Sequence, residues 1–458
     1  MSSSQEDYRE KLKHQSSIFL KILYGLPRSM TSLVLGLESF SIYTLYVFSF
    51  KLHPLLVGIA LACGYISIAL GQFLIGWLSD LKYTKLGRRK PYILLLSPLL
   101  GASFIFLFLP NLFLDITNDI MLFIWLLLFE ILFRFSYSVT TPYQAWMAEI
   151  FKVEERPEVS QIQNIFNYIG TGLMGILVFF VFSDIFSSLK TNIHDISLTY
   201  SLVIIIIGIL TISLFYLLVL FFPREKYHSI NTNLKENLHI ILQNTNFLRV
   251  VFMHGFSGIA WSIIASGILT YNQEVLGLQN VQYLLIGAVL AIGTLTFLYL
   301  WRKKIEQKGK KKSLLIILII AICSLPSTLL GLLSFLIPPI IIGIIFTLFM
   351  GLINAGWNLF PYIIYADISQ DENRESGNLL AGTYTGFPFL VLNLFQAVGI
   401  LLLGMLTSLK PIDVGAQTFS FGLTLWGPIC ALILLISYFF TKKQVILDFQ
   451  WEEKTKNK

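Results

Sequence analysis

Three ionisable side chains lie deep inside long apolar segments of the sequence, at Glu38, Glu130 and Arg134. An ionised group at mid-membrane costs several kcal/mol, so such groups are usually paired, in a wet cavity, or both. Glu130 and Arg134 are four residues apart and therefore share one face of a helix, where they can pair. Arg134 can also be shared with Glu38 if the two helices face each other. We predict that the three residues bind and release a proton or cation; the alternative is a static ion pair that fixes helix packing.

Glu38 is the preferred proton carrier, because no cation lies within its own predicted helix, residues 29–50. Burial raises the proton affinity of a carboxylate and a nearby arginine lowers it, so movement of Arg134 could load and release one proton. Glu130 would then chiefly hold Arg134. The planar guanidinium of Arg134 could also donate hydrogen bonds to hydroxyl or phosphate groups of a ligand.

The elements that position these residues must be membrane-spanning helices. The chain of 458 residues is 55% hydrophobic and only 13% charged, with a mean hydropathy of +0.73, so it has too few charges to cover a globule. Apolar runs long enough to cross a bilayer recur about twelve times. They lie near 29–50, 54–78, 92–110, 120–145, 161–183, 197–222, 248–271, 281–301, 314–335, 339–366, 378–405 and 419–441.

The cations are distributed unevenly between the two sides of these runs. Arg134 lies within a run, and the loops after odd-numbered runs hold only Lys51, Lys190 and Lys410 of the 33 Lys and Arg residues. The other cations flank the first run or follow even-numbered runs, which predicts that both termini are cytoplasmic. The net charge of +7 therefore indicates topology and contact with anionic lipid, and it gives no case for a nucleic-acid partner.

Other sequence features exclude several classes of site. Cys63, Cys323 and Cys430 are far apart inside apolar runs and read as packing residues, without a disulfide or metal role. No phosphate-binding glycine loop and no HExxH pattern is present, so we expect no enzyme activity, no ATP site and no cofactor. The N-terminus lacks a signal-peptide pattern, and Ile18 to Tyr24 are predicted to form a short interfacial helix.

The two halves of the chain repeat each other. Gly87-Arg88-Arg89-Lys90 resembles Gly309-Lys310-Lys311-Lys312, 222 residues later. Pro142-Tyr143, Ala148-Glu149-Ile150 and Glu155-Arg156 are matched by Pro361-Tyr362, Ala366-Asp367-Ile368 and Glu372 with Arg374. Two independent motifs that repeat at distances agreeing within a few residues predict a duplicated six-helix unit. The expected segments are a cytoplasmic N-terminal segment (1–28), a first bundle (29–222), a cytoplasmic linker (223–247), a second bundle (248–441) and a cytoplasmic tail (442–458).

With these motifs, the whole chain resembles the major facilitator superfamily. Gly76, Asp80, Gly87, Arg88 and Arg89 follow the pattern of that superfamily's loop between helices two and three. The long spacer before Gly87 and the Arg-Arg-Lys-Pro-Tyr after it are similar to the glycoside-pentoside-hexuronide:cation symporters and to the sucrose and proton-associated sugar transporters. Melibiose-type members of that group carry acids on helix two, and another before the proline of helix four. Leu55 to Leu78 contain no acid and Thr141 precedes Pro142, so the resemblance does not extend that cation site to this chain.

The resemblance implies an all-α membrane protein with twelve transmembrane helices in two six-helix bundles. It implies a secondary active transporter in the cell membrane, working as a monomer by alternating access, with a sugar or glycoside as substrate and a proton or cation as coupling ion. A lysophospholipid or other amphiphile is an alternative substrate. A nontransporting scaffold or assembly factor is an alternative of another class, although a scaffold has no reason to retain three charges at membrane depth.

Polar residues inside the predicted helices are candidates for a central cavity between the bundles. Amide side chains also hold membrane helices together, which is the alternative for each of them. The candidates are Tyr65, Gln72, Tyr137, Thr141, Asn164, Asn167, Tyr168, Trp261, Asn354, Asn358, Asn393 and Gln396. His254, which shares a helix face with Trp261, is interpreted as a packing residue.

A second set of residues is predicted to close the cytoplasmic side. Asp80 would lie at the positive N-terminal end of helix eleven, near Asn378, and would be oriented by Arg88 and Arg89. Asp367 and Arg374 would have the equivalent role in the other half. The predicted gate comprises Gly76, Asp80, Gly87, Arg88, Arg89, Glu149, Asp367 and Arg374. The alternative is that these charges only set topology.

Overall fold

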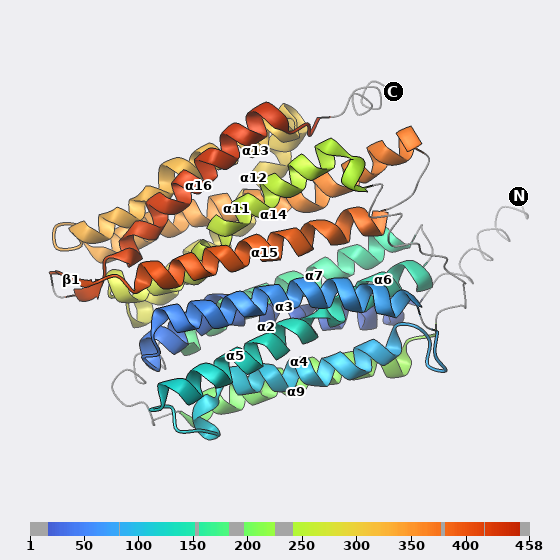
Figure 1. Ribbon diagram of the computed structural model, residues 1–458, viewed down its shortest axis with the longest axis horizontal. Coiled ribbons are helices and arrows are strands. Elements are labelled where there is room, and N and C mark those ends of the chain that lie inside the picture. The colour runs from blue at the N-terminus through green and yellow to red at the C-terminus, as the bar shows by residue number, and fades with distance from the viewer. Residues whose placement is uncertain are drawn as a thin grey trace, which may run out of the picture.

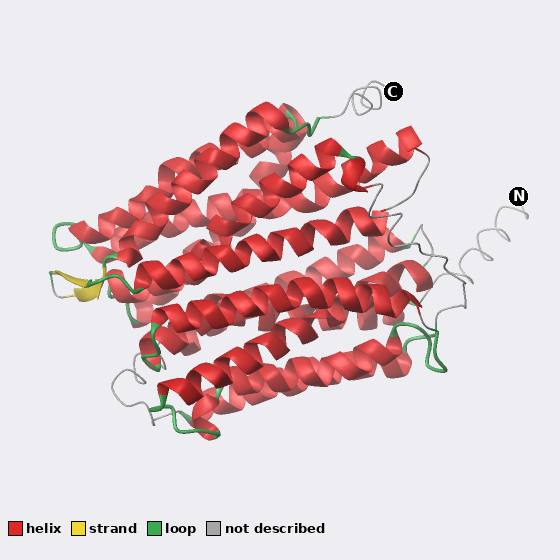
Figure 2. Cartoon of the chain, in the orientation of Figure 1, coloured by secondary structure: helices red, strands yellow, loops and turns green. Residues whose placement is uncertain are grey.

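The computed structural model describes residues 17–81, 83–151, 155–182, 197–224, 241–376, 381–415 and 417–448. These residues form a bundle of long helices with one short β-hairpin (Figure 2). The start of the first helix and the end of the last helix lie at one end of the bundle, and the hairpin lies at the other (Figure 1). We call these the termini end and the hairpin end.

The first half of the chain contains six membrane-length rods, several of them built from more than one helical segment. The segments are α2 (Ile18–Thr44) with the π-helical turn η1 (Leu45–Ser49), α3 (Pro54–Leu81), α4 (Lys90–Phe108), the short η2 (Pro110–Leu112), α5 (Asp119–Ser136) with η3 (Tyr137–Val139) and α6 (Thr140–Ile150), α7 (Arg156–Ile176) with η4 (Leu177–Phe182), and α9 (Leu198–Phe221).

The second half repeats this plan. Its segments are α11 (Thr245–Thr270) with the π-helical turn η5 (Tyr271–Val275), α12 (Asn280–Lys308), α13 (Lys310–Ser324) with the 3₁₀ segment η6 (Leu325–Leu333), α14 (Pro339–Ser376), α15 (Ala381–Thr407), the strands β1 (Pro411–Val414) and β2 (Gln417–Ser420), and α16 (Gly422–Gln444). The antiparallel hairpin, which pairs Pro411 with Ser420, joins α15 to α16.

Hydropathy identifies eleven of the rods in the described part as long and apolar enough to cross a membrane. The rod formed by α7 and η4 is the twelfth. It is less apolar because polar residues such as Asn164 and Thr171 run along one side of α7. The sequence predicted this rod as a span over 161–183, and the fold places it within the first six-helix bundle (Figure 1).

Helices pair in the same way in both halves. In the first half α2 packs on α7, α3 on α5, and α4 on α9; in the second, α11 packs on α15, α12 on α14, and α13 on α16. The halves meet where α3 packs on α15 and α2 packs on α11. Figure 1 shows α3 and α15 side by side in the middle of the molecule. We call this contact between the halves the seam.

The repeat extends to the turns that end α2 and α11. Both helices finish in a π-helical turn, in which the N–H of the residue after the turn donates to the carbonyl of its first residue: Phe50 to Leu45, and Leu276 to Tyr271. The next residue in each half has a positive φ, 60° at Lys51 and 61° at Gly277. Glycine adopts this backbone conformation freely, whereas lysine does so at a cost.

The start of the first rod differs from the sequence prediction. The separate interfacial helix expected over Ile18–Tyr24 is wrong, because these residues form the first turns of α2. Lys21 is buried there, and its Nζ lies 2.5 Å from Glu158 Oε2 and 3.7 Å from Glu155 Oε1. Pairing with acids near the start of α7 neutralises Lys21 and allows the helix to begin earlier than the apolar run.

Candidate functional site

The three buried charges meet between α2 and α5. Asn118 caps the N-terminus of α5 by accepting hydrogen bonds from the N–H groups of Ile120 and Met121, and the helix then carries Glu130 and Arg134 on one face. Arg134 Nε lies 3.0 Å from Glu130 Oε1, and Arg134 Nη2 lies 2.7 Å from Glu38 Oε1 on α2. We call these three residues the triad.

The triad is enclosed by helix α3. The Arg134 guanidinium lies 4.1 Å from the centre of the Tyr65 ring, a distance at which a cation and an aromatic face attract. Gly64 precedes Tyr65, and a methyl group built on Gly64 would overlap the Glu130 carboxylate. Exposed fractions are 1% for Glu38, 0% for Glu130 and 3% for Arg134. The glycine therefore makes the space that the second acid occupies.

Two acids share one cation in this buried site. Ser39 Oγ donates to Glu38 Oε2 over 3.0 Å, while Glu130 Oε2 is buried and has no hydrogen-bond partner among the described residues. With both acids ionised the triad carries a net charge of −1, which is unfavourable in a dry interior. A static bridge needs only one acid. The second acid gives the site the capacity to bind one proton or monovalent cation.

The structure contradicts the reason for which the sequence favoured Glu38 over Glu130 as the proton carrier. Because α2 begins at Ile18, the helix that carries Glu38 also contains the cations Lys21 and Arg28. Both lie toward the termini end, and Arg28 is about 15 Å from Glu38 along the helix at 1.5 Å per residue. The geometry makes Glu38 and Glu130 comparable candidates, since Arg134 contacts each of them directly.

The helix face that carries Glu130 and Arg134 changes character within one turn beyond Arg134. The 3₁₀ segment η3 interrupts the helix at Tyr137, whose side chain is buried, and the α-helix resumes as α6 at Thr140. Thr141 packs toward α3, where a methyl group built on Gly76 would lie 3.1 Å from its Cγ2. A short 3₁₀ stretch inside a helix is a frequent place for a hinge, and this one directly follows the triad.

The predicted cavity residues of the first half differ in their surroundings. Tyr65 packs against Arg134 of the triad, and Asn167 is engaged in packing because its Oδ1 accepts a hydrogen bond of 2.5 Å from Ser32 Oγ. Gln72 is half-buried on α3. Asn164 and Tyr168 are exposed on α7, together with Thr171 of the same ridge.

Helix α7 has two distinct exposed faces. The apolar face is spaced at helical intervals and comprises Ile165, Ile169, Leu173 and Ile176. The polar face comprises Asn164, Tyr168 and Thr171, and it continues to Gly175, where a methyl group would meet nothing within 4 Å. An apolar face suits lipid and a polar face does not. The polar face of α7 therefore suits a wet surface inside the protein.

The second half supplies aromatic and amide candidates. Trp261 stacks on Trp357, with ring centres 5.2 Å apart, so the structure pairs a predicted cavity residue with one that the sequence did not indicate. Asn358 donates to Asn354 over 3.0 Å. Asn393 is buried and donates to the carbonyl of Phe389 in its own helix. Gln396 is half-buried on α15 and packs against α11 at Gly258.

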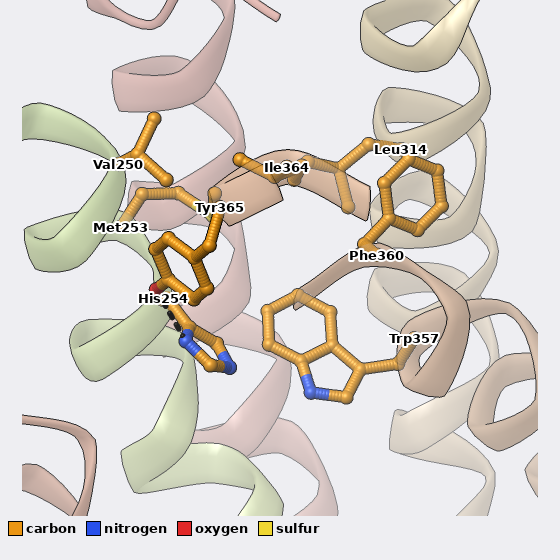
Figure 3. A pocket seen from close by; sticks show the side chains of 8 residues that line it. All are labelled: Val250, Met253, His254, Leu314, Trp357, Phe360, Ile364 and Tyr365. Carbon is orange, nitrogen blue, oxygen red and sulfur yellow. Dashed lines mark hydrogen bonds between the residues drawn. The ribbon is translucent and has the colours of Figure 1, made fainter. Parts of the chain in front are cut away.

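Beside this aromatic pair lies a small cavity of about 10 Å³, close to the space that one water molecule needs. Figure 3 shows its lining, in which His254 Nδ1 lies 2.7 Å from the Tyr365 hydroxyl. The other lining residues are Val250, Met253, Leu314, Trp357, Phe360 and Ile364. The hydrogen bond to Tyr365 makes His254 a satisfied buried residue, in agreement with its interpretation as a packing residue.

The predicted gate residues of the first half cluster at the termini end. Arg89 Nη2 lies 2.5 Å from Glu149 Oε1, and Arg88 Nη2 lies 3.2 Å from the same oxygen. Arg89 also donates to Ser79 Oγ over 2.6 Å. Gly87 takes a φ of 102°, which lets the chain turn before the two arginines. The side chain of Asp80 and residue Asn378 lie outside the described residues.

The second half repeats this ion pair with other residues. Lys310 Nζ lies 2.5 Å from Asp367 Oδ2, and the preceding Gly309 has a φ of 82°. Gly309 alone joins α12 to α13, whereas residues 82–89 join α3 to α4. The side chain of Arg374, the predicted partner of Asp367, lies outside the described residues.

Residues after α16 dock onto this corner, which sequence analysis missed. Val445 and Leu447 are buried, and Asn246 exchanges two hydrogen bonds with the backbone of Ile446, of 3.1 Å and 3.0 Å. Asp448 Oδ1 accepts from the N–H of Lys310 over 2.8 Å and so caps α13. The apolar run Val445-Ile446-Leu447 directly after the helix was the available signal.

We expect Asp448→Ala to lower the free energy of unfolding by about 1 kcal/mol, the usual worth of a helix cap. Asp448→Asn retains an oxygen that can accept the same bond and should keep most of the stability. Thermal melting of the purified variants measures both. An equal loss in both variants would contradict the cap and assign the effect to charge beside Lys310.

The halves are joined by hydrogen bonds toward the hairpin end. Thr44 Oγ1 lies 2.9 Å from Thr270 Oγ1, Tyr43 bonds through its hydroxyl to Thr407, and Ser266 Oγ donates to the carbonyl of Ser39 over 3.2 Å. In the same region a methyl group built on Gly404 would lie 2.9 Å from the carbonyl of Pro54 and 3.2 Å from Cα of Gly58. The seam is therefore tightly closed at the hairpin end.

Comparisons with known proteins agree with this architecture. Residues 23–442 match the family model described as MFS/sugar transport protein. None of the curated proteins compared matches the chain in sequence. Similar solved structures include a D-xylose-proton symporter (TM-score 0.71, 15% identity, covering 94% of this chain and 99% of that one). The nucleoside transporter NupG (0.63, 12%, 93% and 98%) and a bacterial homolog of the human lysosomal transporter Spinster (0.63, 15%, 92% and 95%) are also similar.

The structural matches support the twelve-helix fold in two bundles, and the family match covers nearly the whole chain. The sequence-based resemblance to the major facilitator superfamily is confirmed by both. The chain belongs to the MFS/sugar transport protein family and is a multi-pass membrane transporter with the major facilitator fold, not an enzyme.

Proposed function

We propose that this transporter couples the uptake of a sugar or glycoside to the movement of one proton through the triad. The observation that carries the proposal is the buried arrangement of two acids around one arginine, in which Arg134 contacts Glu38 and Glu130 within 3.0 Å. One bound proton makes the triad neutral and its release restores a net negative charge. A change of charge in a dry site alters the balance between conformations that solvate it differently.

A neutral, hydroxyl-rich substrate fits the other candidate residues. The polar face of α7 presents amide, phenol and hydroxyl groups, and Trp261 and Trp357 provide stacked aromatic surface in the other half. Sugar rings are bound by such combinations of hydrogen-bonding groups and apolar faces. Within this proposal the termini end is cytoplasmic and the closed seam faces the outside.

The test uses purified protein in liposomes with radiolabelled D-xylose, sucrose, melibiose and lysophosphatidylcholine as probes. An inward proton gradient should drive accumulation of one of the sugars by the unaltered protein. Glu38→Gln or Glu130→Gln, whichever residue carries the proton, should reduce gradient-driven uptake at least about 100-fold but preserve counterflow exchange, because exchange needs no net proton movement.

Glu306→Gln is the control, since Glu306 forms an exposed pair with Arg302 and should leave both activities unchanged. Full gradient-driven uptake by both triad variants would refute proton coupling through the triad. Transport of the lysolipid without any sugar would support the amphiphile alternative.

A further inference from the structure

The triad lies wholly within the first half, so its charge must be linked to the second half by something else. Ser39 lies between the triad and the second half and bonds to both. Its hydroxyl donates to Glu38 Oε2 over 3.0 Å, and its backbone carbonyl accepts from Ser266 Oγ of α11 over 3.2 Å. One residue of α2 thus contacts both the triad and the opposite half.

We propose that Ser39 is a positioning residue that transmits the charge state of Glu38 to the seam through Ser266. The inference rests on the proposed function, because it assumes that Glu38 changes charge during the cycle. It adds the physical route by which a proton bound in one half changes the contact with the other.

The route follows from the strength and direction of hydrogen bonds. A hydroxyl bonded to a carboxylate is held about twice as strongly as one bonded to a neutral acid. When Glu38 is neutral, the Ser39 hydroxyl can turn to a carbonyl one turn back in its own helix, an arrangement that bends helices. A bend there moves the Ser39 carbonyl that accepts from Ser266.

The same peptide group is linked to a second contact across the seam. In an α-helix the carbonyl of residue 39 accepts from the N–H of residue 43. Tyr43 bonds through its hydroxyl to Thr407 of α15, and Thr44 bonds to Thr270 of α11. A shift at Ser39 is therefore passed within one helical turn to both helices that the second half brings to the seam.

Other titratable groups face the triad, and they are few. Arg134 and Glu130 come from α5, Tyr65 from α3 and Tyr46 from η1. The helices α4, α7, α9 and α11 also pack against α2 or α5, but their charged residues lie elsewhere. Their charged residues and histidine are Lys90, Arg156, Glu158, Arg249 and His254, all toward the termini end, and α9 contains no charged residue. Their tyrosines are Tyr92, Tyr168, Tyr200 and Tyr216. His254, for example, precedes the contact residue Ser266 by about 18 Å of helix.

The experiment measures the seam directly and needs no substrate. Spin labels are attached at Leu112→Cys and Lys410→Cys, two exposed positions at the hairpin end of opposite halves, in protein whose Cys63 and Cys323 are replaced by alanine. Distance distributions are recorded between pH 4.5 and 8.5 in lipid nanodiscs. The unaltered seam should change its ratio of open to closed populations by at least about fivefold over this range.

Ser39→Ala should abolish most of that response while leaving the protein folded, and Ser39→Thr, which retains the hydroxyl, should restore it. Ser266→Ala should weaken the response from the other side. Ser41→Ala is the matched control on the same helix, because the buried Ser41 hydroxyl has no hydrogen-bond partner among the described residues.

The outcomes separate this inference from the proposed function. If the unaltered protein shows no pH response, or if both Glu38→Gln and Glu130→Gln respond normally, coupling through the triad fails. If Glu38→Gln loses the response but Ser39→Ala responds like the unaltered protein, the triad stands and the role of Ser39 is overturned. A loss in Ser41→Ala equal to that in Ser39→Ala would also overturn it.

Discussion

Replacing Arg134 with alanine is expected to lower the free energy of unfolding by about 3–5 kcal/mol and to abolish transport. The arginine is the cation between two acids that are almost completely buried. Removing one partner of a buried ion pair leaves charge uncompensated in a medium of low polarity, and the cost falls in that range. Transport is lost as well, because no positive charge then remains beside the two acids to lower their proton affinity and release the proton.

Unfolding in mixed micelles and uptake into liposomes measure the two effects separately. Arg302→Ala is the control, because Arg302 and Glu306 are 78% and 63% exposed and such a pair contributes less than about 1 kcal/mol. The triple change Arg134→Met, Glu38→Gln and Glu130→Gln removes every charge and should recover most of the stability without recovering transport. If Arg134→Ala were as stable as Arg302→Ala, the triad would have to be wet and its charges separately solvated.

Adding a single methyl group at Gly404 is expected to open the hairpin end of the seam. A Cβ atom on this residue would approach the carbonyl of Pro54 to 2.9 Å and Cα of Gly58 to 3.2 Å, both of them backbone atoms that cannot rotate away. Overpacking of this kind costs about 1–3 kcal/mol in the closed state alone, which shifts the open to closed ratio by about 5- to 150-fold. Gly404→Ala should therefore favour the state that is open at the hairpin end and slow transport.

Gly172→Ala is the matched control, since a Cβ atom on Gly172 would meet nothing within 4 Å. Both substitutions exchange glycine for alanine within a helix and share the same gain in helix propensity of about 1 kcal/mol. The difference between them therefore isolates the contact at the seam. Distances between labels at the hairpin end, compared in the two variants, give the measurement. An identical distribution in both would show that the seam has room for a side chain.

The sequence was sufficient to predict the fold and the meeting of the triad residues. Charges at membrane depth are so costly that Glu38, Glu130 and Arg134 had to find one another, and spacing placed two of them on one face. The repeat of Gly87 and Gly309 likewise indicated two equivalent turns, and both glycines have a positive φ. These signals are local in sequence or enforced by a large energy.

Contacts that each contribute little free energy could not be predicted from the sequence. Nothing in the sequence distinguishes Asn167, which bonds to Ser32, from Asn164, which is exposed, because both lie on the same helix and differ only in the direction they face. The seam depends on small residues such as Gly404, whose role appears only when the opposite helix is in place. The start of α2 was missed because hydropathy does not include the acids that neutralise Lys21.

The single residue between α12 and α13 makes the duplicated halves mechanically unequal. At Gly309 a tilt of one helix passes directly into its neighbour, and Asp448 holds that corner by accepting a hydrogen bond from the N–H of Lys310. The matching connection over residues 82–89 is long enough to absorb such a tilt before it reaches α4. We therefore expect the second half to move as a rigid body while the first half deforms locally. The second half, which carries none of the triad, should then set the rate of opening at the termini end.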